Sequence, residues 1–285
     1  MLRIAGLTVV AMLAFAANSV LARLALAAGD AGALGYTGIR LAAGAAVLAG
    51  LLALRQRRHV GLGGSWRGAA ALLAYAVAFS VAYLMLNAGA GALILFASVQ
   101  VGMLAWALRL GDRPGGLEWL GLAVAFAALA FLMSPGLAAP HPLGAALMAA
   151  AGLSWAAYSL LGRGSDLPLV DTAGNFVRCL PVAAVLAVAG VAIQPPSAAG
   201  AAYAVASGAL ASGLGYAIWY AALPGLSRSA AAFVQLTVPA IAAAGGVLFL
   251  GEPLTTRLVL ASAGILGGVA LALFAAERRR ARRMD

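Results

Sequence analysis

Charged residues are scarce in this sequence, and lysine is absent altogether. Only 9% of the 285 residues are charged and 64% are hydrophobic, whereas a soluble domain carries about 25% charged residues. Apolar runs long enough to cross a bilayer, which takes about 20 residues, recur along the chain. These features exclude an ordinary soluble protein and predict an all-α integral membrane protein.

Cysteine and histidine are nearly absent. The single cysteine, Cys179, lies inside an apolar run, so neither a disulfide framework nor a metal cluster can be built from it. His59 and His141 fall between runs, which leaves no base for an intramembrane serine protease. Paired aspartates for a metal-dependent prenyl transferase are also missing. We therefore expect no enzyme activity, no cofactor and no metal.

Carboxylates are missing from the middle of every apolar run. The acidic residues fall at run ends, in connections or in the tail: Asp30, Asp112, Glu118, Asp166, Asp171, Glu252, Glu277 and Asp285. Embedded carboxylates are the usual proton relays and cation sites of transporters. Their absence argues against a proton wire or a site for organic cations, and it favours facilitated transport over proton coupling.

Ten transmembrane helices are predicted from the apolar runs. Turn-forming residues separate them, among them Gly29-Asp30, Pro195-Pro196 and Gly251-Glu252-Pro253. The first run resembles a signal peptide, but its internal repeat, described below, favours a retained first helix. The expected spans are 3–27, 33–54, 68–87, 90–109, 116–133, 143–163, 170–192, 199–221, 229–250 and 257–276.

The arginines predict an orientation with both termini in the cytoplasm. With the N-terminus inside, fourteen of the 18 arginines lie in cytoplasmic segments or the tail, as the positive-inside rule requires. The net charge of +10 therefore indicates membrane insertion and no nucleic-acid partner. The basic tail, residues 277–285, is expected to touch anionic lipid headgroups. The exceptions are Arg23, Arg40, Arg178 and Arg257.

The chain repeats itself at half its length. Residues 14–23 and 154–163 are identical at five of ten positions, and residues 40–49 and 178–187 at six of ten. Gly111-Asp112 corresponds to Gly251-Glu252, Tyr83 to Tyr220 and Phe96 to Phe233. Because each half holds an odd number of spans, the second half crosses the membrane in the opposite sense. We expect two inverted five-helix repeats, residues 1–137 and 138–276.

This ordered set of features resembles the drug/metabolite transporter (DMT) superfamily, specifically its EamA-type ten-helix exporters. The features are the two five-span halves, the arginine early in spans 2 and 7, and the Gly-acid turn before spans 5 and 10. The chain departs from the family pattern in having Asp112 for the usual glutamate and in lacking a proline in span 4 to match Pro239. The resemblance implies a cavity lined by spans 1, 3, 4, 6, 8 and 9, with YddG-like exporters of aromatic amino acids as the nearest comparison.

Aromatic and amide side chains on these spans are the candidates for a substrate cavity. Tyr75, Phe79 and Tyr83 recur every four residues on one helix face, and Phe79 and Tyr83 correspond to Tyr216 and Tyr220 of the second half. Helix packing or an aromatic belt at the lipid interface is the alternative for each. The candidate cavity residues are Phe15, Asn18, Tyr75, Phe79, Tyr83, Gln100, Trp155, Tyr158, Tyr216, Trp219 and Gln235.

Four further residues are candidates for gating or structural roles. Arg40 and Arg178 are the charges placed well within spans, where they brace helix junctions or attract a carboxylate substrate. Pro181 and Pro239 are expected to kink their helices.

The predicted function is export of small amphiphilic metabolites, foremost aromatic or large apolar amino acids, across the bacterial inner membrane by alternating access. Open alternatives are export of nucleosides, purines or drugs, a lipid-carrier flippase, and a membrane scaffold without transport. The expected partners are the small-molecule substrate and membrane lipids. The expected assembly is a monomer or a weak homodimer that uses spans 5 and 10.

Overall fold

The computed structural model describes residues 2–55, 61–111, 114–134, 136, 139–163, 165–226, 231 and 234–281. Every regular element among these residues is helical. The elements are α1 (Leu2–Ala27), α2 (Ala33–Arg55), α3 (Trp66–Ala82), α4 (Ala88–Arg109), α5 (Gly116–Met133), α6 (Pro142–Leu161), α7 (Pro168–Ile193), α8 (Ala198–Ala206), the π-helix η1 (Ser207–Leu214), α9 (Gly215–Ala222), the short 3₁₀ turn η2 (Leu223–Gly225), α11 (Val238–Leu250) and α12 (Thr256–Ala281).

Eight helical segments of the described chain are long and apolar enough to cross a membrane. One of them, Ala198–Gly225, joins α8, η1, α9 and η2 into a single span. Two further apolar helices, α3 and α11, are shorter than the others. The helical membrane fold is thereby supported, while the crossing of α3 and α11, and with it the number ten, stays a prediction.

Glycines end the helices where the sequence predicts breaks. Gly29, Gly111 and Gly251 each follow a helix and have φ angles of 75°, 85° and 63°, the left-handed region that favours glycine. Asp112, the partner of Gly111 in the first Gly-acid turn, lies outside the described residues.

Helix packing is reciprocal between the two halves. In the first half α2 packs on α7 of the second, α5 on α12, and α4 on α11. α3 packs on α6, and correspondingly the α8–α9 span packs on α1. Two halves that share one fold would make contacts of this kind.

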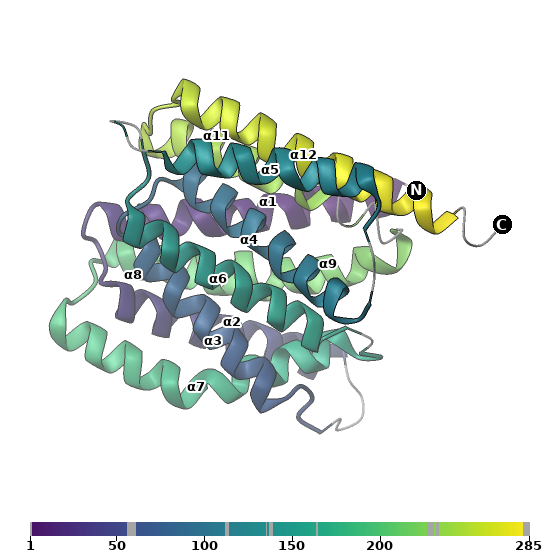
Figure 1. Ribbon diagram of the computed structural model, residues 1–285. Helices are drawn as coiled ribbons and strands as arrows, with labels where there is room; N and C mark the ends of the chain where they lie inside the picture. The colour runs from purple at the N-terminus through teal and green to yellow at the C-terminus, as the bar shows by residue number, and fades with distance from the viewer. Residues whose placement is uncertain are drawn as a thin grey trace.

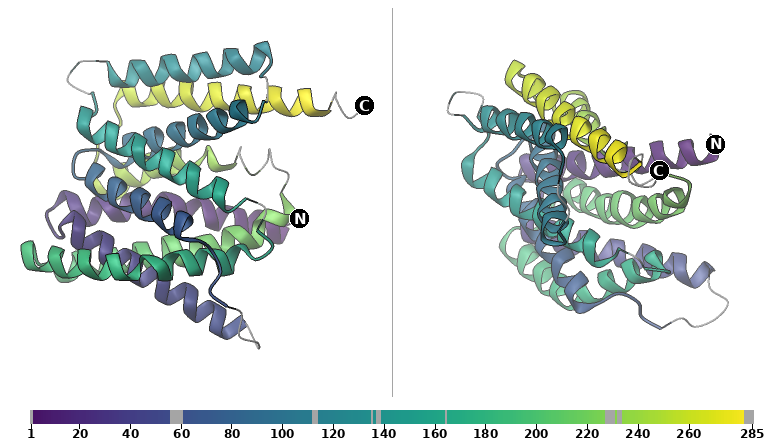
Figure 2. Two further views of the ribbon diagram at one scale, coloured as in Figure 1. Left: turned by 60° about the horizontal axis from the view of Figure 1, so that its bottom comes forward. Right: turned by 45° about the vertical axis from the view of Figure 1, so that its right-hand side comes forward.

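The pair α5 and α12 runs along one edge of the bundle (Figures 1 and 2). A Cβ on Gly121 of α5 would come within 2.5 Å of the Gly268 carbonyl oxygen of α12, and the reverse distance is the same. Glycine at both positions therefore lets the two backbones touch. The bond from Arg279 Nε to Glu118 Oε1, 2.6 Å long, closes this pair at one end.

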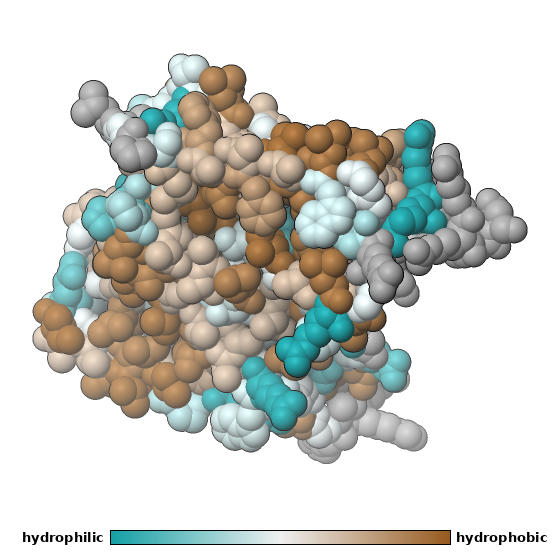
Figure 3. Space-filling model, in the orientation of Figure 1, coloured by the Kyte–Doolittle hydropathy of each residue, from teal (hydrophilic) through white to brown (hydrophobic). Residues whose placement is uncertain are grey.

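The start of α1 and the end of α12 lie at the same end of the bundle (Figure 1). Apolar side chains cover much of the middle of the visible face, and most hydrophilic side chains lie toward its margins (Figure 3). Large exposed side chains such as Val188, Leu248 and Phe249 suit contact with lipid. Which end faces the cytoplasm stays a prediction.

One expectation about local helix geometry is wrong, and a second span has a geometry that the sequence did not indicate. Pro239 does not kink a long span 229–250. It lies in the first turn of α11, after a turn at Leu236–Thr237, where a missing N–H leaves no hydrogen bond unmade. The span 199–221 is not a uniform α-helix, because residues 207–214 form a π-helix. Pro181 does lie inside a continuous helix, α7.

Candidate binding cavity

A hollow lies where helices of both halves meet. It holds about 420 Å³ of space between atoms, part of it open to the surface. Little of this space is wide enough for water, so a larger ligand requires the side chains to move apart. Its lining comes from α1, α3, α4, α6, the η1–α9 segment and the residues before α11: Phe15, Asn18, Ser19, Tyr75, Phe79, Leu95, Phe96, Trp155, Ala211, Tyr216 and Gln235. These are the spans that the family resemblance implies.

Aromatic rings form most of the wall. The Trp155 ring centroid lies 5.0 Å from that of Tyr75 and 5.2 Å from that of Tyr216. Phe15 meets Tyr216 edge-on at 5.8 Å. Tyr75 and Phe79 lie one turn apart on α3, with ring centroids 5.3 Å apart. Tyr75 and Trp155 thus join α3 to α6, while Phe15 joins α1 to α9, so rings from both halves face one space.

The π-helix η1 brings hydroxyl groups to this wall. A Cβ on Gly208 would come within 2.1 Å of the Arg40 carbonyl oxygen, so glycine is needed for η1 to lie against α2. Ser207 Oγ donates to Asn18 Oδ1 at 2.6 Å, and Ser212 Oγ accepts from Arg40 Nε at 3.4 Å. π-Helical turns are rare and often occur at functional sites.

A chain of polar contacts runs behind the aromatic wall. The hydroxyl oxygen of Tyr75 accepts from Asn18 Nδ2 at 3.1 Å and from Arg40 Nη2 at 3.1 Å. Ser207 completes the chain through Asn18. Elements α1, α2, α3 and η1 are therefore connected by hydrogen bonds at one wall of the cavity, where a bilayer offers little water to replace them.

Arg40 is buried at this wall, with 2% of its surface exposed. Its guanidinium carbon lies 4.8 Å from the ring centroid of Phe79 and 5.3 Å from that of Tyr75. Its Nη1 atom is buried without a hydrogen-bond partner. Among the described residues no carboxylate forms an ion pair with Arg40. The cation is balanced by rings and hydroxyl groups alone.

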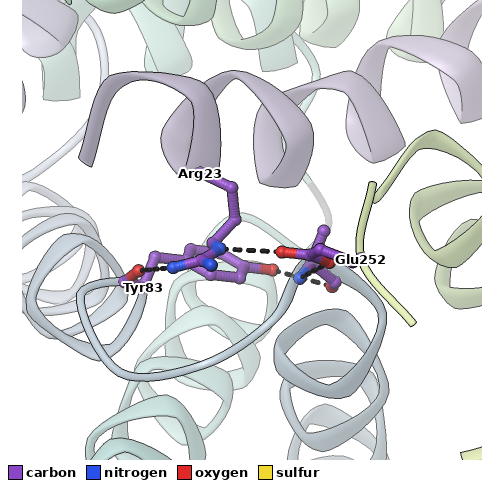
Figure 4. A network of polar contacts seen from close by, with 4 residues as sticks. Arg23, Tyr83 and Glu252 are labelled. Atoms are coloured by element: carbon purple, nitrogen blue, oxygen red, sulfur yellow. Dashed lines mark hydrogen bonds and ion pairs between the residues drawn. The ribbon is translucent and has the colours of Figure 1, made fainter. Parts of the chain in front are cut away.

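A second arginine, Arg23 of α1, pairs with a carboxylate and a carbonyl (Figure 4). Arg23 Nε lies 2.9 Å from Glu252 Oε1, and Arg23 Nη1 donates to the Tyr83 carbonyl at 2.9 Å. Glu252 Oε2 accepts from the Ala88 amide at 2.8 Å. We call these four residues the Arg23 cluster. It joins the end of α1 to the α3–α4 and α11–α12 connections.

The Arg23 cluster packs directly against the wall of the cavity. The ring of Tyr83, which is fully buried, packs edge-on against Phe79 at 4.7 Å between centroids, and Phe79 lines the cavity. Tyr83 itself is not a lining residue; its hydroxyl donates to the Ala88 carbonyl at 3.4 Å. Tyr83, a predicted cavity residue, is therefore part of the Arg23 cluster and packs behind the cavity wall.

Three other candidates lie outside the lining. Tyr158 stacks behind Trp155 at 5.3 Å, and its hydroxyl donates to Thr172 Oγ1 of α7. Trp219 meets Phe15 edge-on at 6.0 Å. Gln100 lies on α4 beyond the lining residues of that helix. The structure thus brings together Phe15, Asn18, Tyr75, Phe79, Trp155, Tyr216 and Gln235, and places the remaining candidates around them.

Arg178 braces a helix junction. Its Nη1 donates to the carbonyls of Gly63 and Gly174, and its guanidinium lies 5.8 Å from the Trp66 ring. It fastens α7 to the segment before α3, away from the cavity. Arg40 and Arg178 correspond in the repeat, yet only Arg40 reaches the cavity wall.

Sequence reasoning missed Ser19, Leu95, Phe96 and Ala211 as lining residues, and Ser207 behind them. Ser19 lies in the repeated segment 14–23. The sequence comparison of the two halves pairs Phe96 with Phe233, and Phe233 lies outside the described residues. Leu95 and Ala211 give no signal, because apolar residues of this kind occur throughout the chain.

Comparisons with known proteins relate the second half of the chain to a family of transporters. Residues 142–274 match the EamA-like transporter family, which covers the second half from α6 into α12. An uncharacterized protein of Pseudomonas aeruginosa is 53% identical over 267 residues, 94% of this chain and 93% of its own. A protein of known crystal structure shares the fold, with a TM-score of 0.68, 21% identity, and coverage of 96% of this chain and 97% of its own.

Proposed function

We propose that this chain, whose residues 142–274 match the EamA-like transporter family, exports small amphiphilic metabolites, foremost aromatic or large apolar amino acids. Within that proposal it is a multi-pass protein of the bacterial inner membrane, with both termini in the cytoplasm. We propose that the two halves, 1–137 and 138–276, are inverted repeats. The basic segment 277–285 follows them, and α12 continues into it as far as Ala281.

One observation carries the proposal: an aromatic cavity with a few polar groups, partly open to the surface, lies between helices of both halves. Rings of Trp155, Tyr75 and Tyr216 offer surface to an apolar or aromatic side chain. Asn18 and Gln235 offer amides to polar groups of the ligand. A site at the interface of the two halves can open to either side as they rock against each other.

The cavity lining holds no acidic side chain among the described residues. The acidic residues Asp30, Glu118 and Glu252 lie at helix ends and are bonded there to Ser197, Arg279 and Arg23. This placement supports facilitated movement down a gradient, without a carboxylate proton relay in the cavity. We propose that the Arg23 cluster holds one end closed in this conformation and separates when that end opens.

Transport by purified protein in liposomes tests the proposal. Uptake of labelled phenylalanine and leucine, with and without a pH gradient, is expected to exceed that of protein-free liposomes and to be independent of the gradient. Nucleosides and purines in the same assay test the alternative substrate class. If neither amino acid moves, the substrate proposal is wrong; if movement needs protons, the facilitative mechanism is wrong.

Matched tryptophan variants tie transport to the cavity. Trp155→Ala is expected to reduce uptake about tenfold or more, because the ring contacts both Tyr75 and Tyr216. Trp119→Ala is the control, since Trp119 is exposed on α5 and outside the lining. Protein amount in the liposomes is measured for each. Equal uptake by the two variants would remove Trp155 from the site.

We propose a monomer or a weak homodimer. α5 and α12 bind mainly each other and lie at one edge, so this pair is the surface available to a second copy. Cross-linking between cysteines placed at exposed α5 positions such as Leu120 and Val124, in membranes, tests this assembly.

A further inference from the structure

The hydroxyl hydrogen of Tyr75 has no acceptor in the described part of the protein. A phenol oxygen has two lone pairs and one hydrogen. Both lone pairs of Tyr75 are used, by Asn18 Nδ2 and by Arg40 Nη2, each at 3.1 Å. The hydrogen is therefore left to donate, and Tyr75 lines the cavity. A ligand in the cavity that carries an acceptor can meet this hydrogen.

The neighbouring charge determines which acceptor is favoured. Arg40 donates to the Tyr75 oxygen, and a hydrogen bond from a cation makes the phenol a stronger donor. The guanidinium has no carboxylate partner among the described residues, and Nη1 is buried with no partner at all. A buried charge in this state is stabilised by any anion that approaches it. The wall therefore favours a ligand with a negative group.

The other walls offer nothing that requires a positive group. Lining side chains other than Tyr75 are apolar, aromatic, amide or hydroxyl. The acceptors that an ammonium group would find are ring faces, the Ser19 hydroxyl and the amide oxygens of Asn18 and Gln235, and that of Asn18 already accepts from Ser207. None of them carries a negative charge. The cavity therefore favours a negative group on the ligand and does not require a positive one.

We propose that Tyr75 and Arg40 together recognise a carboxylate, and that the ligands of this cavity are aromatic or apolar monocarboxylates for which an amino group is not needed. The Tyr75 hydroxyl donates directly to the carboxylate, and Arg40 supplies the positive charge behind it. This inference rests on the proposed function and narrows its substrate class. Tyr75 contacts the ligand; Arg40 acts through Tyr75 as a positioning residue.

Three ligands of one shape test the proposal on the detergent-purified full chain. Phenylalanine is a zwitterion, 3-phenyllactate replaces its ammonium by a hydroxyl, and phenylalaninamide lacks the carboxylate. Isothermal titration is expected to show 3-phenyllactate binding at least as tightly as phenylalanine. Phenylalaninamide is expected to bind at least tenfold more weakly than either.

Two variants test whether Tyr75 and Arg40 cause this preference for a carboxylate. Tyr75→Phe keeps the ring and removes the donor, and it is expected to lower 3-phenyllactate affinity about tenfold while leaving phenylalaninamide affinity unchanged. Arg40→Gln removes the charge and is expected to lower 3-phenyllactate affinity about a hundredfold, again with phenylalaninamide affinity unchanged. Tyr203→Phe removes a hydroxyl from α8 outside the lining and is the matched control. The ligand comparison on the unaltered protein needs no variant, so it stands even if Arg40→Gln does not fold.

The outcomes separate this inference from the proposed function. Binding of phenylalaninamide as tight as that of 3-phenyllactate overturns the inference and leaves amino-acid transport standing. A preference for carboxylate that survives Tyr75→Phe also overturns it. Binding of 3-phenyllactate without phenylalanine upholds the inference and refutes amino acids as substrates. Failure of all three ligands to bind refutes both.

Discussion

Two arginines near the same end of the bundle have opposite surroundings. Arg23 of α1 is paired with Glu252 and with the Tyr83 carbonyl, at the junction of two connections. Arg40 of α2 is buried among Tyr75, Phe79 and Ser212 and has no carboxylate partner among the described residues. Phe79 touches both surroundings, since its ring meets Tyr83 on one side and the Arg40 guanidinium on the other.

The presence or absence of a carboxylate partner indicates what a buried arginine does in a membrane protein. A paired arginine is satisfied without a ligand, and removing its partner is what destabilises the protein. An unpaired buried arginine costs stability by itself, so its presence indicates a partner that comes and goes. The Arg23 cluster therefore needs no ligand to be stable, and we propose that Arg40 belongs to the binding site.

The largest expected effect is on binding at Arg40. Arg40→Met removes the charge but keeps a long apolar side chain, and 3-phenyllactate affinity is expected to fall about a hundredfold, or ~3 kcal/mol. Thermal unfolding in detergent is expected to occur at the same or a higher temperature, because an uncompensated buried charge is removed. A clear loss of stability without loss of affinity would make Arg40 a structural residue.

The opposite pattern is expected at Arg23. Arg23→Met leaves the Glu252 carboxylate unpaired and is expected to reduce stability by about 2 kcal/mol, with ligand affinity unchanged. The pair Arg23→Met and Glu252→Gln, measured singly and together, isolates the coupling between the two side chains. Additive losses of stability would mean that the ion pair contributes nothing.

The smallest expected effect is at the residue that the two surroundings share. Phe79→Leu keeps an apolar side chain but removes the ring face over which Arg40 lies, 4.8 Å from its centroid. Affinity for 3-phenyllactate is expected to fall about threefold, the scale of a cation–π contact. An effect as large as that of Arg40→Met would instead point to a general collapse of the wall.

Much of the cavity was predictable because aromatic and amide residues at helical spacing are rare in so apolar a chain. Phe79 and Tyr216 were found through the repeat, and Trp155 through its correspondence with Phe15. Tyr83 lies in the Arg23 cluster, which joins residues 229 positions apart in the chain, and no local sequence pattern indicates a contact over that separation.

The π-helix was beyond sequence reasoning for a physical reason. A π-turn shifts every later side chain by about one position relative to α-helical spacing, so sequence spacing alone does not give the helix faces on which Ser212 and Tyr216 lie. Gly208 and Gly213 permit the close approach of η1 to α2, but glycines are common throughout this chain and do not mark it. The start of α11 at Val238 was missed because Pro239 suits a helix interior kink and a first turn equally.

Net charge of the transported species tests the central claim most directly. If the cavity carries an aromatic carboxylate without a proton, each molecule moves one negative charge, and 100 mV is then worth about 2.3 kcal/mol per charge. Proteoliposomes with a valinomycin–potassium potential of 100 mV, interior positive, are expected to accumulate labelled 3-phenyllactate up to about fiftyfold, with protein-free and Arg40→Met liposomes as controls. If accumulation of 3-phenyllactate by the unaltered protein does not depend on the potential, the cavity does not carry an anion by means of Arg40 and Tyr75.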